Sequence, residues 1–509
     1  MTDTNTSHTG QQRPSYLTFT LLALLYLLFL YWVKSWWGLV VLPFLFDAYI
    51  THKIPWTWWK NHPSPVVRTI MSWVDAIVFA LVGVYFLNLF FFQNFIIPSS
   101  SLEKTYLTGD HLLVSKYEYG ARIPETPLSM PLTQNTLPIL NTKSYLETPH
   151  WDYRRTAGRD TVKAGDIVVF NFPAGDTVAL NAQNPDYYSL TQQIGASILA
   201  AQNSLVLPTP ADDYATQQAI FRQWRETGKA YIAANREEFG DIIYRPTDRR
   251  ENYVKRCVGL PGQTLRIVDD RILLDGKVLP DAEKVQFNYD ADFLLPLDAD
   301  IIRELGISAE DIQNYQNGGG LPMTLAVKRA LTERGYIAPN PPRTTPATNG
   351  LYPINKATGW TTRNYGGKEG VWIPRRGGRL ALTLDNLPIY ERCIRDYEHN
   401  RLEVRDTTIY INGTPADSYT FKMDYFWMMG DNRDNSADSR FWGFVPEDHV
   451  VGTPLFVWLS LDPDYGWLDG KVRLSRSYIG LAVIGGLLLF FFGYNYYYNR
   501  RQKKSCTAS

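Results

Sequence analysis

The chain has few of the residues from which metal and disulfide sites are built. Its 509 residues include three cysteines and seven histidines. No two cysteines are spaced as a C-x-x-C pair, and no histidines form an H-E-x-x-H motif. A Walker A loop, a G-x-G-x-x-G turn and a G-x-S-x-G elbow are absent as well. These absences argue against metal, nucleotide and α/β-hydrolase chemistry, so we expect no metal and no cofactor.

The overall charge gives no sign of a nucleic-acid partner. Lysine plus arginine and aspartate plus glutamate both number 51, so the formal net charge is zero. Apolar residues are instead concentrated at the two ends, and seven of the fifteen tryptophans precede residue 74. Aromatic residues beside apolar runs are typical of membrane interfaces. The sequence therefore indicates membrane-embedded ends and a water-soluble middle.

Four apolar runs predict about four membrane-spanning helices. They cover residues 16–33, 36–50, 71–97 and 478–498. The first has about the length that crosses a bilayer. The second is short, so it forms either a tight span or a re-entrant segment, and we favour a span. No small-x-small cleavage site follows the first run, which predicts a retained anchor and not a removed signal peptide.

Basic residues in short loops predict the orientation of these spans. Lys53, Lys60 and Arg68 lie between the second and third runs, and four basic residues follow the fourth. Placing both groups in the cytoplasm exports the middle of the chain, although three basic residues just before the fourth run oppose this. The expected organisation is an N-terminal anchor (1–97), an exported catalytic domain (98–477) and a C-terminal helix with a basic tail (478–509).

Short alternating runs with turn punctuation predict that the exported part is mainly antiparallel β. Asp275-Gly276 and Asn412-Gly413 are expected to form hairpin turns. Two less regular regions, 175–250 and 281–385, are expected insertions with helical and irregular structure, and Ser308 is an expected N-cap. The predicted fold class is a membrane-anchored, mainly β protein with α and irregular insertions.

One segment has an internal echo. Residues 255–276 resemble 391–413, because both begin with a charged residue and Arg-Cys and both end in an Asp-Gly or Asn-Gly turn. Two explanations stay open: chance similarity between two β-hairpins, or a duplication in which Glu391 stands at the position of Lys255.

The same echo bears on the cysteines. If the two segments are neighbours, Cys257 and Cys393 can form a disulfide, which an oxidising outer compartment permits. We favour two free buried thiols. Cys506 is expected to stay reduced in the cytoplasm.

Three short segments carry most of the polar chemistry. Three consecutive serines follow the third apolar run, and Lys255 falls mid-strand in "ENYVKRCVGLPG". The third segment, "MMGDNRDNSADSRFWGFVPEDH", is either a solvated polar loop or a rigid platform, and its self-complementary charge favours the platform. Its charged residues include Asp431, Asp434, Asp438, Arg433 and Arg440.

A serine hydroxyl is a poor nucleophile and needs an adjacent base. His111 lies in a strand-like run and is not expected to act as that base. A lysine can act only when neutral, so its pKa of ~10.4 would have to fall by roughly 3 units, or about 4 kcal/mol. Burial among apolar residues can cause this fall, whereas pairing with a carboxylate would oppose it. Val254 and Val258 beside Lys255 favour burial, and a surface position is the alternative.

Four segments carry a resemblance to a known family. In order, "IIPSSSLEKTYLTGD", "GDIVVFNFP", "YVKRCVGLPG" and "GDNRDNSADSRFWGFVP" resemble the successive conserved boxes of bacterial type I signal peptidases. The third and fourth boxes are the most specific. The two insertions and the extra spans lie outside these boxes, and their size is similar to that of enlarged Gram-negative forms.

The resemblance implies roles for named residues. Ser101 would be the nucleophile and Lys255 its general base. Ser99 would donate a side-chain hydrogen bond to the oxyanion, alongside the backbone N–H of Ser101. Ser436 would hold the Lys255 amine in place. The structural support would come from two ion pairs, Asp431 with Arg256 and Asp438 with Arg440.

The chain departs from the family pattern just after the nucleophile. Leu102 stands where the family usually has Met, and it preserves an apolar contact. Lys104 stands where the family usually has Pro, so it removes a rigid bend and adds a second amine. Lys104 is therefore an alternative base.

The resemblance implies a membrane-bound serine endopeptidase that removes N-terminal signal peptides from exported preproteins after small-x-small sites. Its partners would be preprotein signal peptides, membrane lipid and the protein-export translocon. It would reside in the bacterial inner membrane as a multi-pass protein whose catalytic domain faces the periplasm.

Two other functions are alternatives to this one. Self-cleaving repressors of related fold need a DNA-binding domain, and no segment of this chain resembles one. A catalytically inactive, membrane-anchored binding or scaffold relative should have lost Ser101, Lys255 or Ser436, and all three are present.

Overall fold

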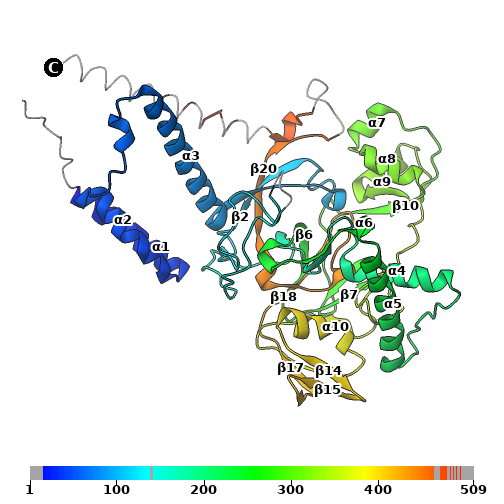
Figure 1. The fold of residues 1–509 in the computed structure, drawn as a ribbon. Helices are drawn as coiled ribbons and strands as arrows, with labels where there is room; N and C mark the ends of the chain where they lie inside the picture. The colour runs from blue at the N-terminus through cyan, green and yellow to red at the C-terminus, as the bar shows by residue number, and fades with distance from the viewer. Residues whose placement is uncertain are drawn as a thin grey trace, which may run out of the picture.

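The computed structural model describes residues 15–137, 142–463 and 471–477, with Ala482, Gly485, Gly486, Leu489 and Gly493 as single positions beyond them. Apart from these positions, the predicted span 478–498 lies outside the described residues, and so does Cys506. Figure 1 shows helices α1 to α3 on one side of a β body, with two helical regions on the opposite side.

Two helices near the N-terminus are long and apolar enough to cross a membrane, among the residues that the structure describes. They are α1 (Tyr16–Val33) and α3 (Pro65–Phe90). Protein covers little of either, because 11% and 0% of their most apolar windows are buried. The apolar surface of both helices is therefore left open to its surroundings.

The segment between them runs back along α1. It is a short helix built from three pieces, 3-10 (Trp36–Val41), α2 (Leu42–Phe46) and a π turn (Asp47–Thr51). Tyr26 Oη donates a hydrogen bond to Gly38 O (2.9 Å), and Ser15 N donates to Tyr49 O (3.0 Å). The segment thus follows α1 from its C-terminal half back to its N-cap, Ser15.

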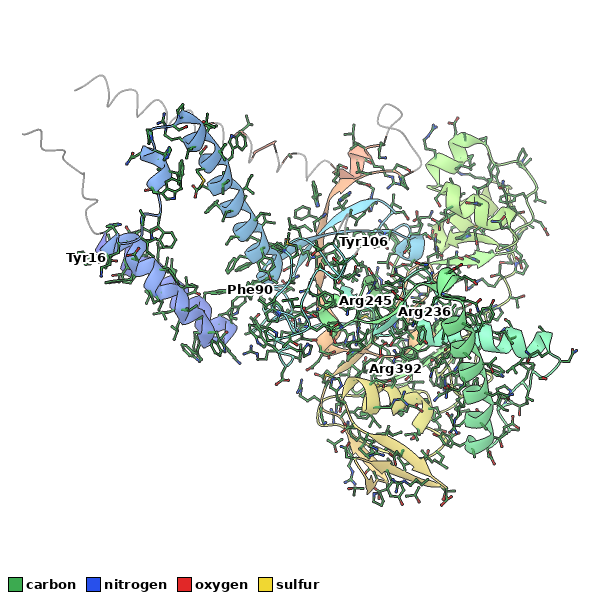
Figure 2. All side chains as sticks on the ribbon, in the orientation of Figure 1. Tyr16, Phe90, Tyr106, Arg236, Arg245 and Arg392 are labelled. Atoms are coloured by element: carbon green, nitrogen blue, oxygen red, sulfur yellow. The ribbon has the colours of Figure 1, made fainter. Side chains whose placement is uncertain are left out.

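The predicted helical run 71–97 is wrong at both ends. The helix begins at Pro65 and ends at Phe90, and Phe92–Ile96 form strand β1. This strand pairs antiparallel with β2 along its whole length. The backbone groups that a helix would pair internally are paired across the sheet instead, which local apolar pattern does not reveal. Figure 2 labels Phe90 where α3 meets the β body.

The β body is built on one seven-stranded antiparallel sheet. Register shifts between β2 and β20 and between β20 and β3 mark bulges, which bend and twist a sheet. Val169 packs on one face of the sheet and its neighbour Val168 on the other. In sheet order the strands are β1 (Phe92–Ile96), β2 (Asp110–Ser115), β20 (Val450–Ser460), β3 (Ile167–Asn171), β6 (Asn252–Gly259), β18 (Tyr425–Met429) and β19 (Val445–Pro446).

A second β unit packs below this sheet in Figure 1. Both predicted hairpin turns are confirmed, because Asp275-Gly276 joins β8 to β9 and Asn412-Gly413 joins β15 to β16, all four with positive φ. Its strands are β12 (Val371–Trp372), β7 (Thr264–Val268), β8 (Arg271–Leu274) and β9 (Lys277–Val278) in one sheet, β14 (Leu402–Arg405), β15 (Thr408–Ile411) and β16 (Thr414–Pro415) in another, and the pair β13 (Arg379–Ala381) and β17 (Ser418–Thr420).

The similarity between residues 255–276 and 391–413 does not extend to the structure of their first parts, which contain the cysteines. Lys255 and Cys257 lie on strand β6, whereas Glu391 lies in the last turn of α10 (Leu387–Arg392) and Cys393 begins the π turn that follows it. Only the two hairpins correspond. Both thiols are buried and free, as we favoured.

The region 175–250 folds as a helical hairpin flanked by a two-stranded sheet. A Cβ on Gly195 would lie 1.8 Å from Trp224 O, and one on Gly228 would lie 1.9 Å from Thr191 O, so these glycines let the two helix backbones touch. The predicted helical insertion is therefore present. Its elements are β4 (Thr177–Ala179), α4 (Tyr187–Ala201), α5 (Tyr214–Ala234), α6 (Arg236–Phe239) and β5 (Ile242–Tyr244).

The second insertion contains a lobe with its own apolar core, residues 282–343, which we call the 282–343 lobe. The predicted N-cap Ser308 is confirmed, because its hydroxyl accepts from Asp311 N while Asp311 accepts from Ser308 N. The lobe contains β10 (Gln286–Tyr289), α7 (Ala299–Glu304), α8 (Ala309–Gln316), β11 (Leu321–Thr324) and α9 (Leu325–Glu333).

Candidate active site

The three serines lie on a loop that extends directly from the edge strand β1. Ile97 N donates to Asp110 O (2.9 Å), and Gly109 N donates to Ile97 O (2.8 Å), so the base of the loop belongs to the sheet. Ser99 is extended and exposed, and Ser100–Leu102 form a 3-10 turn. Ser101 is 9% exposed. The sheet thus fixes where this hydroxyl is presented.

Lys255 lies in the middle of strand β6, between β3 and β18. It is 4% exposed, and its Nζ lies 2.5 Å from Ser101 Oγ. The ammonium group also faces the Tyr253 ring, 5.8 Å from its centroid. Burial lowers the pKa of Lys255 from 10.5 to about 8, against the opposing pull of Asp438 and Asp431. The predicted pair is therefore brought together, and its amine is shifted toward the neutral form.

Both predicted ion pairs are present beneath this pair. Asp431 is fully buried and accepts from Arg256 Nε (2.7 Å) and Nη2 (2.6 Å). Asp438 is likewise fully buried and accepts from Arg440 Nε (2.9 Å) and Nη2 (2.8 Å). Such bidentate pairs fix orientation as well as distance. The segment 428–449 is thus a packed platform and not a solvated loop.

Gly430 allows this platform to touch the nucleophile loop. A Cβ on Gly430 would lie 2.6 Å from Ser101 O and 2.2 Å from Ser436 Oγ. In the same contact, Asn432 N donates to Ser101 O (3.1 Å) and Asn432 Nδ2 to Ser100 O (3.2 Å). The absence of a side chain at Gly430 therefore sets the approach of Ser101 to the platform.

Ser436 does not make the contact with Lys255 that the resemblance implies. It is buried beside Gly430, but its hydroxyl donates to Ala437 O (3.5 Å). Within the described residues, Lys255 Nζ has Ser101 Oγ as its hydrogen-bond partner.

Lys104, the alternative base, is held away from the nucleophile. Its Nζ donates to Asp311 Oδ2 (2.7 Å) and to Gly306 O (2.6 Å). Both hydrogen bonds hold the Lys104 amine on residues 306–311, so it is not the partner of Ser101 Oγ. His111, also considered, packs its ring edge-on against Trp458 at 5.5 Å.

Three further polar residues of the site, Thr105, Asn432 and Glu310, are not among those that the sequence pointed to. Thr105 Oγ1 donates to Asp431 Oδ2 (2.6 Å), Asn432 binds the loop backbone, and Ser100 Oγ donates to Glu310 Oε1 (2.6 Å). Asn432 stands inside the polar segment 428–449, so its density of polar residues was the available signal. Glu310 gave no signal, because it lies 210 positions from Ser100.

A cavity of about 670 Å³ adjoins the edge strand. It lies between the last turns of α3, strand β1 and the segments 122–134 and 248–252. Asn94, Phe95 and Ile96 line one wall, and Met130 and Leu132 line another. Neither Ser101 nor Lys255 lines this cavity, but β1 leads from it to the serine loop.

The fold and the site together define the class of this protein. It is a β protein in which a curled antiparallel sheet places a buried lysine against a serine hydroxyl, an arrangement suited to nucleophilic chemistry. The sequence model of the family described as "Signal peptidase, peptidase S26" matches residues 70–322 and 379–459, more than half of the chain. The chain therefore belongs to the peptidase S26 family.

Curated relatives agree with this family. Signal peptidase I of Buchnera aphidicola subsp. Acyrthosiphon pisum is 34% identical over 258 residues, which cover 49% of this chain and 63% of that protein. Its counterpart from Buchnera aphidicola subsp. Schizaphis graminum is 37% identical over 251 residues, covering 49% and 62%. Signal peptidase I of Haemophilus influenzae is 24% identical over 403 residues, covering 79% and 73%. The chain thus spans somewhat less than two thirds of the two Buchnera relatives.

Proposed function

We propose that this chain is a membrane-anchored serine endopeptidase that removes N-terminal signal peptides from exported preproteins after small-x-small sites. The observation that carries the proposal is the buried contact between Lys255 Nζ and Ser101 Oγ at 2.5 Å, within a chain of the peptidase S26 family. The alternative, a catalytically inactive membrane-anchored scaffold relative, has no specific observation in its favour.

The proposed reaction proceeds through an acyl-enzyme. Neutral Lys255 accepts the Ser101 proton as Oγ attacks the carbonyl carbon of the scissile peptide bond. The Ser101 N–H and the Ser99 hydroxyl donate to the oxyanion that forms. Lys255 then gives its proton to the leaving amine as the C–N bond breaks. Water, deprotonated by the same amine, hydrolyses the ester and frees Ser101, in the Ser-Lys variant of triad logic.

The edge position of β1 supports binding of an extended peptide. Among the described residues β1 pairs with β2 alone, so every second residue of β1 presents N–H and C=O groups at its outer edge that no described strand pairs. A peptide that adds as a further strand gains main-chain hydrogen bonds there. Because β1 continues into the serine loop, such a strand would be led toward Ser101. The cavity beside Phe95 and Ile96 gives room for side chains before the cleavage site.

The arrangement of the helices supports a periplasm-facing catalytic domain in the bacterial inner membrane. Val33 at the end of α1 and Phe90 at the end of α3 lie in one apolar cluster with Ala121 and Ile123 of the β body. Both helices therefore run toward that body, and the 36–51 segment runs back, in keeping with three crossings. Lys53 and Lys60 then fall on the opposite, cytoplasmic side. The proposed partners are signal peptides, lipid and the export translocon.

The basic residues before the last span fit this orientation. Arg476 binds Asp110 on β2 through its Nη2 (2.5 Å), and Arg473 binds Asp462 through its Nη2 (2.8 Å). These two arginines are paired with carboxylates of the β body, so they have little weight as signals for the cytoplasmic side.

The test is cleavage of a co-expressed preprotein by the full-length chain and by Ser101→Ala and Lys255→Met variants. Each variant is expected to lose more than about 10³-fold in activity, since nucleophile and base act as one unit. Thr332→Ala, a hydroxyl removal on α9 away from the pair, serves as the control. Full activity in either dyad variant would end the proposal of a Ser-Lys peptidase, whereas no cleavage by the unaltered full-length chain would favour the scaffold alternative.

A further inference from the structure

We propose that the 282–343 lobe positions the nucleophile, with Glu310 and Asp311 of α8 as positioning residues for the loop that carries Ser101. This inference rests on the proposed function, because it assigns these residues a part in the same reaction. Neither residue touches the reacting atoms. They act through Ser100 and Lys104, which lie before and after Ser101 in the chain.

The first contact is a buried ion pair. Lys104 Nζ lies 2.7 Å from Asp311 Oδ2, and the side chains of Lys104 and Asp311 are 12% and 3% exposed. Lys104 Nζ also donates to Gly306 O (2.6 Å), just before the helix. Asp311 is itself fixed, because it closes the capping box of α8 with Ser308. The charged end of Lys104 is therefore bound to a rigid helix start.

The backbone of Lys104 has an unusual conformation, which this contact helps to hold. Lys104 has φ of +70°, a left-handed conformation that residues with a Cβ rarely adopt. Proline, whose ring holds φ near −65°, cannot take this conformation. Strained backbone of this kind persists only where its surroundings determine it. Here a turn closed by Thr105 N and Leu102 O (3.0 Å) sets this conformation, and the two hydrogen bonds of the Lys104 side chain to the lobe add to that constraint.

The second contact is on the other side of the nucleophile. Ser100 Oγ donates to Glu310 Oε1 (2.6 Å), a hydrogen bond to a charged group. Ser100 immediately precedes Ser101, and its own carbonyl accepts from Glu103 N (2.9 Å) within the turn. The lobe therefore binds the loop both before and after the nucleophile.

The lobe is in turn fixed to the platform on which the site is built. Gln286 N donates to Asp431 O (2.9 Å), and Arg433 N donates to Gln286 O (3.0 Å). Asn288 N also donates to Asp434 Oδ2 (2.8 Å). The nucleophile loop is thus enclosed between the platform and a lobe anchored to it, so its position relative to Lys255 depends on both.

These contacts help to set the distance between Ser101 Oγ and Lys255 Nζ. Proton transfer needs Ser101 Oγ within hydrogen-bond reach of Lys255 Nζ, and a displacement of about 1 Å can cost up to 10²-fold in rate. A loop released from Glu310 and Asp311 keeps its platform contacts and its own turn but loses its side-chain hydrogen bonds to the lobe on both sides of Ser101. We therefore expect slower chemistry with unchanged substrate binding.

The experiment measures kcat, KM, pH profile and thermal unfolding of the full-length protein in detergent with a peptide substrate. Lys104→Gln and Glu310→Ala are each expected to lower kcat by about 10-fold or more with KM within about twofold, as misplacement of a reacting group predicts. Lys104→Arg should restore most of the loss. The matched control is Glu333→Ala, an exposed glutamate of α9 in the same lobe.

A double variant separates positioning from a general loss of structure. If Glu310 acts through Ser100, then Ser100→Ala with Glu310→Ala should be no slower than either single variant. The pH midpoint of kcat/KM should stay in place, because the base is untouched, while the height of the profile falls. A shifted midpoint, or kcat losses that multiply, would count against the inference.

The outcomes also distinguish this inference from the proposed function. Full kcat in Lys104→Gln and Glu310→Ala, with Ser101→Ala inactive, overturns the positioning role and leaves the peptidase intact. Activity in Ser101→Ala overturns the proposed function itself. A lower thermal midpoint with normal kcat would assign the lobe to stability alone.

Discussion

Lys255 Nζ lies 2.5 Å from Ser101 Oγ, although 154 positions separate the two residues. Both side chains are nearly inaccessible to water, at 4% and 9% exposure. Burial is what brings the pKa of the lysine down to about 8, since the nearby carboxylates oppose it. The same desolvation that makes the amine a usable base also makes its charged form costly to the fold, and both effects can be measured.

The pH dependence of activity follows from the direction of this shift. Lys255 must be neutral to accept the proton, so kcat/KM should rise about tenfold per pH unit up to about pH 8 and then level off. Glu103, beside the nucleophile, also titrates nearby, because burial raises its pKa to about 7. A Glu103→Gln variant separates the two. A profile in that variant that is flat between pH 6 and 8 would exclude Lys255 as the base.

Stability should respond to the same group in the opposite way from activity. The pKa of Lys255 is lower in the folded protein (about 8) than in the unfolded chain (10.5), so folded stability is reduced below pH 8 and recovers as pH rises toward 10.5. Lys255→Met removes this cost but also removes the hydrogen bond to Ser101. The net effect should be a free energy of unfolding at pH 7 that is higher by about 2 kcal/mol. Denaturant unfolding at pH 7 and pH 10 measures this. A variant less stable than the parent at both pH values would contradict the prediction.

Gly430→Ala should disrupt the site although both dyad residues are kept. The new Cβ would lie 2.6 Å from Ser101 O and 2.2 Å from Ser436 Oγ, so backbone has to move. We expect a loss of activity of about 10²-fold and a destabilisation of about 1–3 kcal/mol from overpacking. The control is Gly83→Ala in α3, where an added Cβ meets nothing within 4 Å. Normal turnover by Gly430→Ala would show that this close approach is not needed.

Asp431→Asn tests the platform. Asp431 accepts three hydrogen bonds, two from Arg256 and one from Thr105, so its neutralisation leaves a mostly buried guanidinium without its counterion. We expect a loss of about 3 kcal/mol of stability. Because Asp431 raises the pKa of Lys255, the acid limb of the pH profile should move to lower pH. Asp300→Asn, at a 93% exposed side chain, is the control. An acid limb that moves to higher pH would contradict the electrostatic account.

Local features of the sequence predicted local features of the structure. The turns at Asp275-Gly276 and Asn412-Gly413 need positive φ, and the Ser308 capping box needs only four residues, so both are encoded in short segments. The polar density of 428–449 likewise indicated a platform, and its paired charges Asp438 and Arg440 are near neighbours along the chain.

Predictions that depended on distant partners were less successful. Phe92–Ile96 continued an apolar run and were assigned to the helix, but pairing with β2 makes them a strand. The contact between Ser436 and Lys255 that the resemblance implies is not formed, and Lys255 Nζ has Ser101 Oγ as its hydrogen-bond partner within the described residues. Glu391 and Lys255 occupy similar places in two echoing segments, yet one folds as helix and the other as strand.

The sequence by itself determined which groups are available: a serine at the end of an apolar run, a lysine among valines and a segment rich in paired charges. Tertiary structure decided what those groups do, because the depressed pKa of Lys255 comes from its place between β3 and β18. It also decided that Glu310 reaches Ser100 across 210 positions. Local sequence encodes conformational preference within a few residues, whereas desolvation and contact depend on which distant segments the fold brings together.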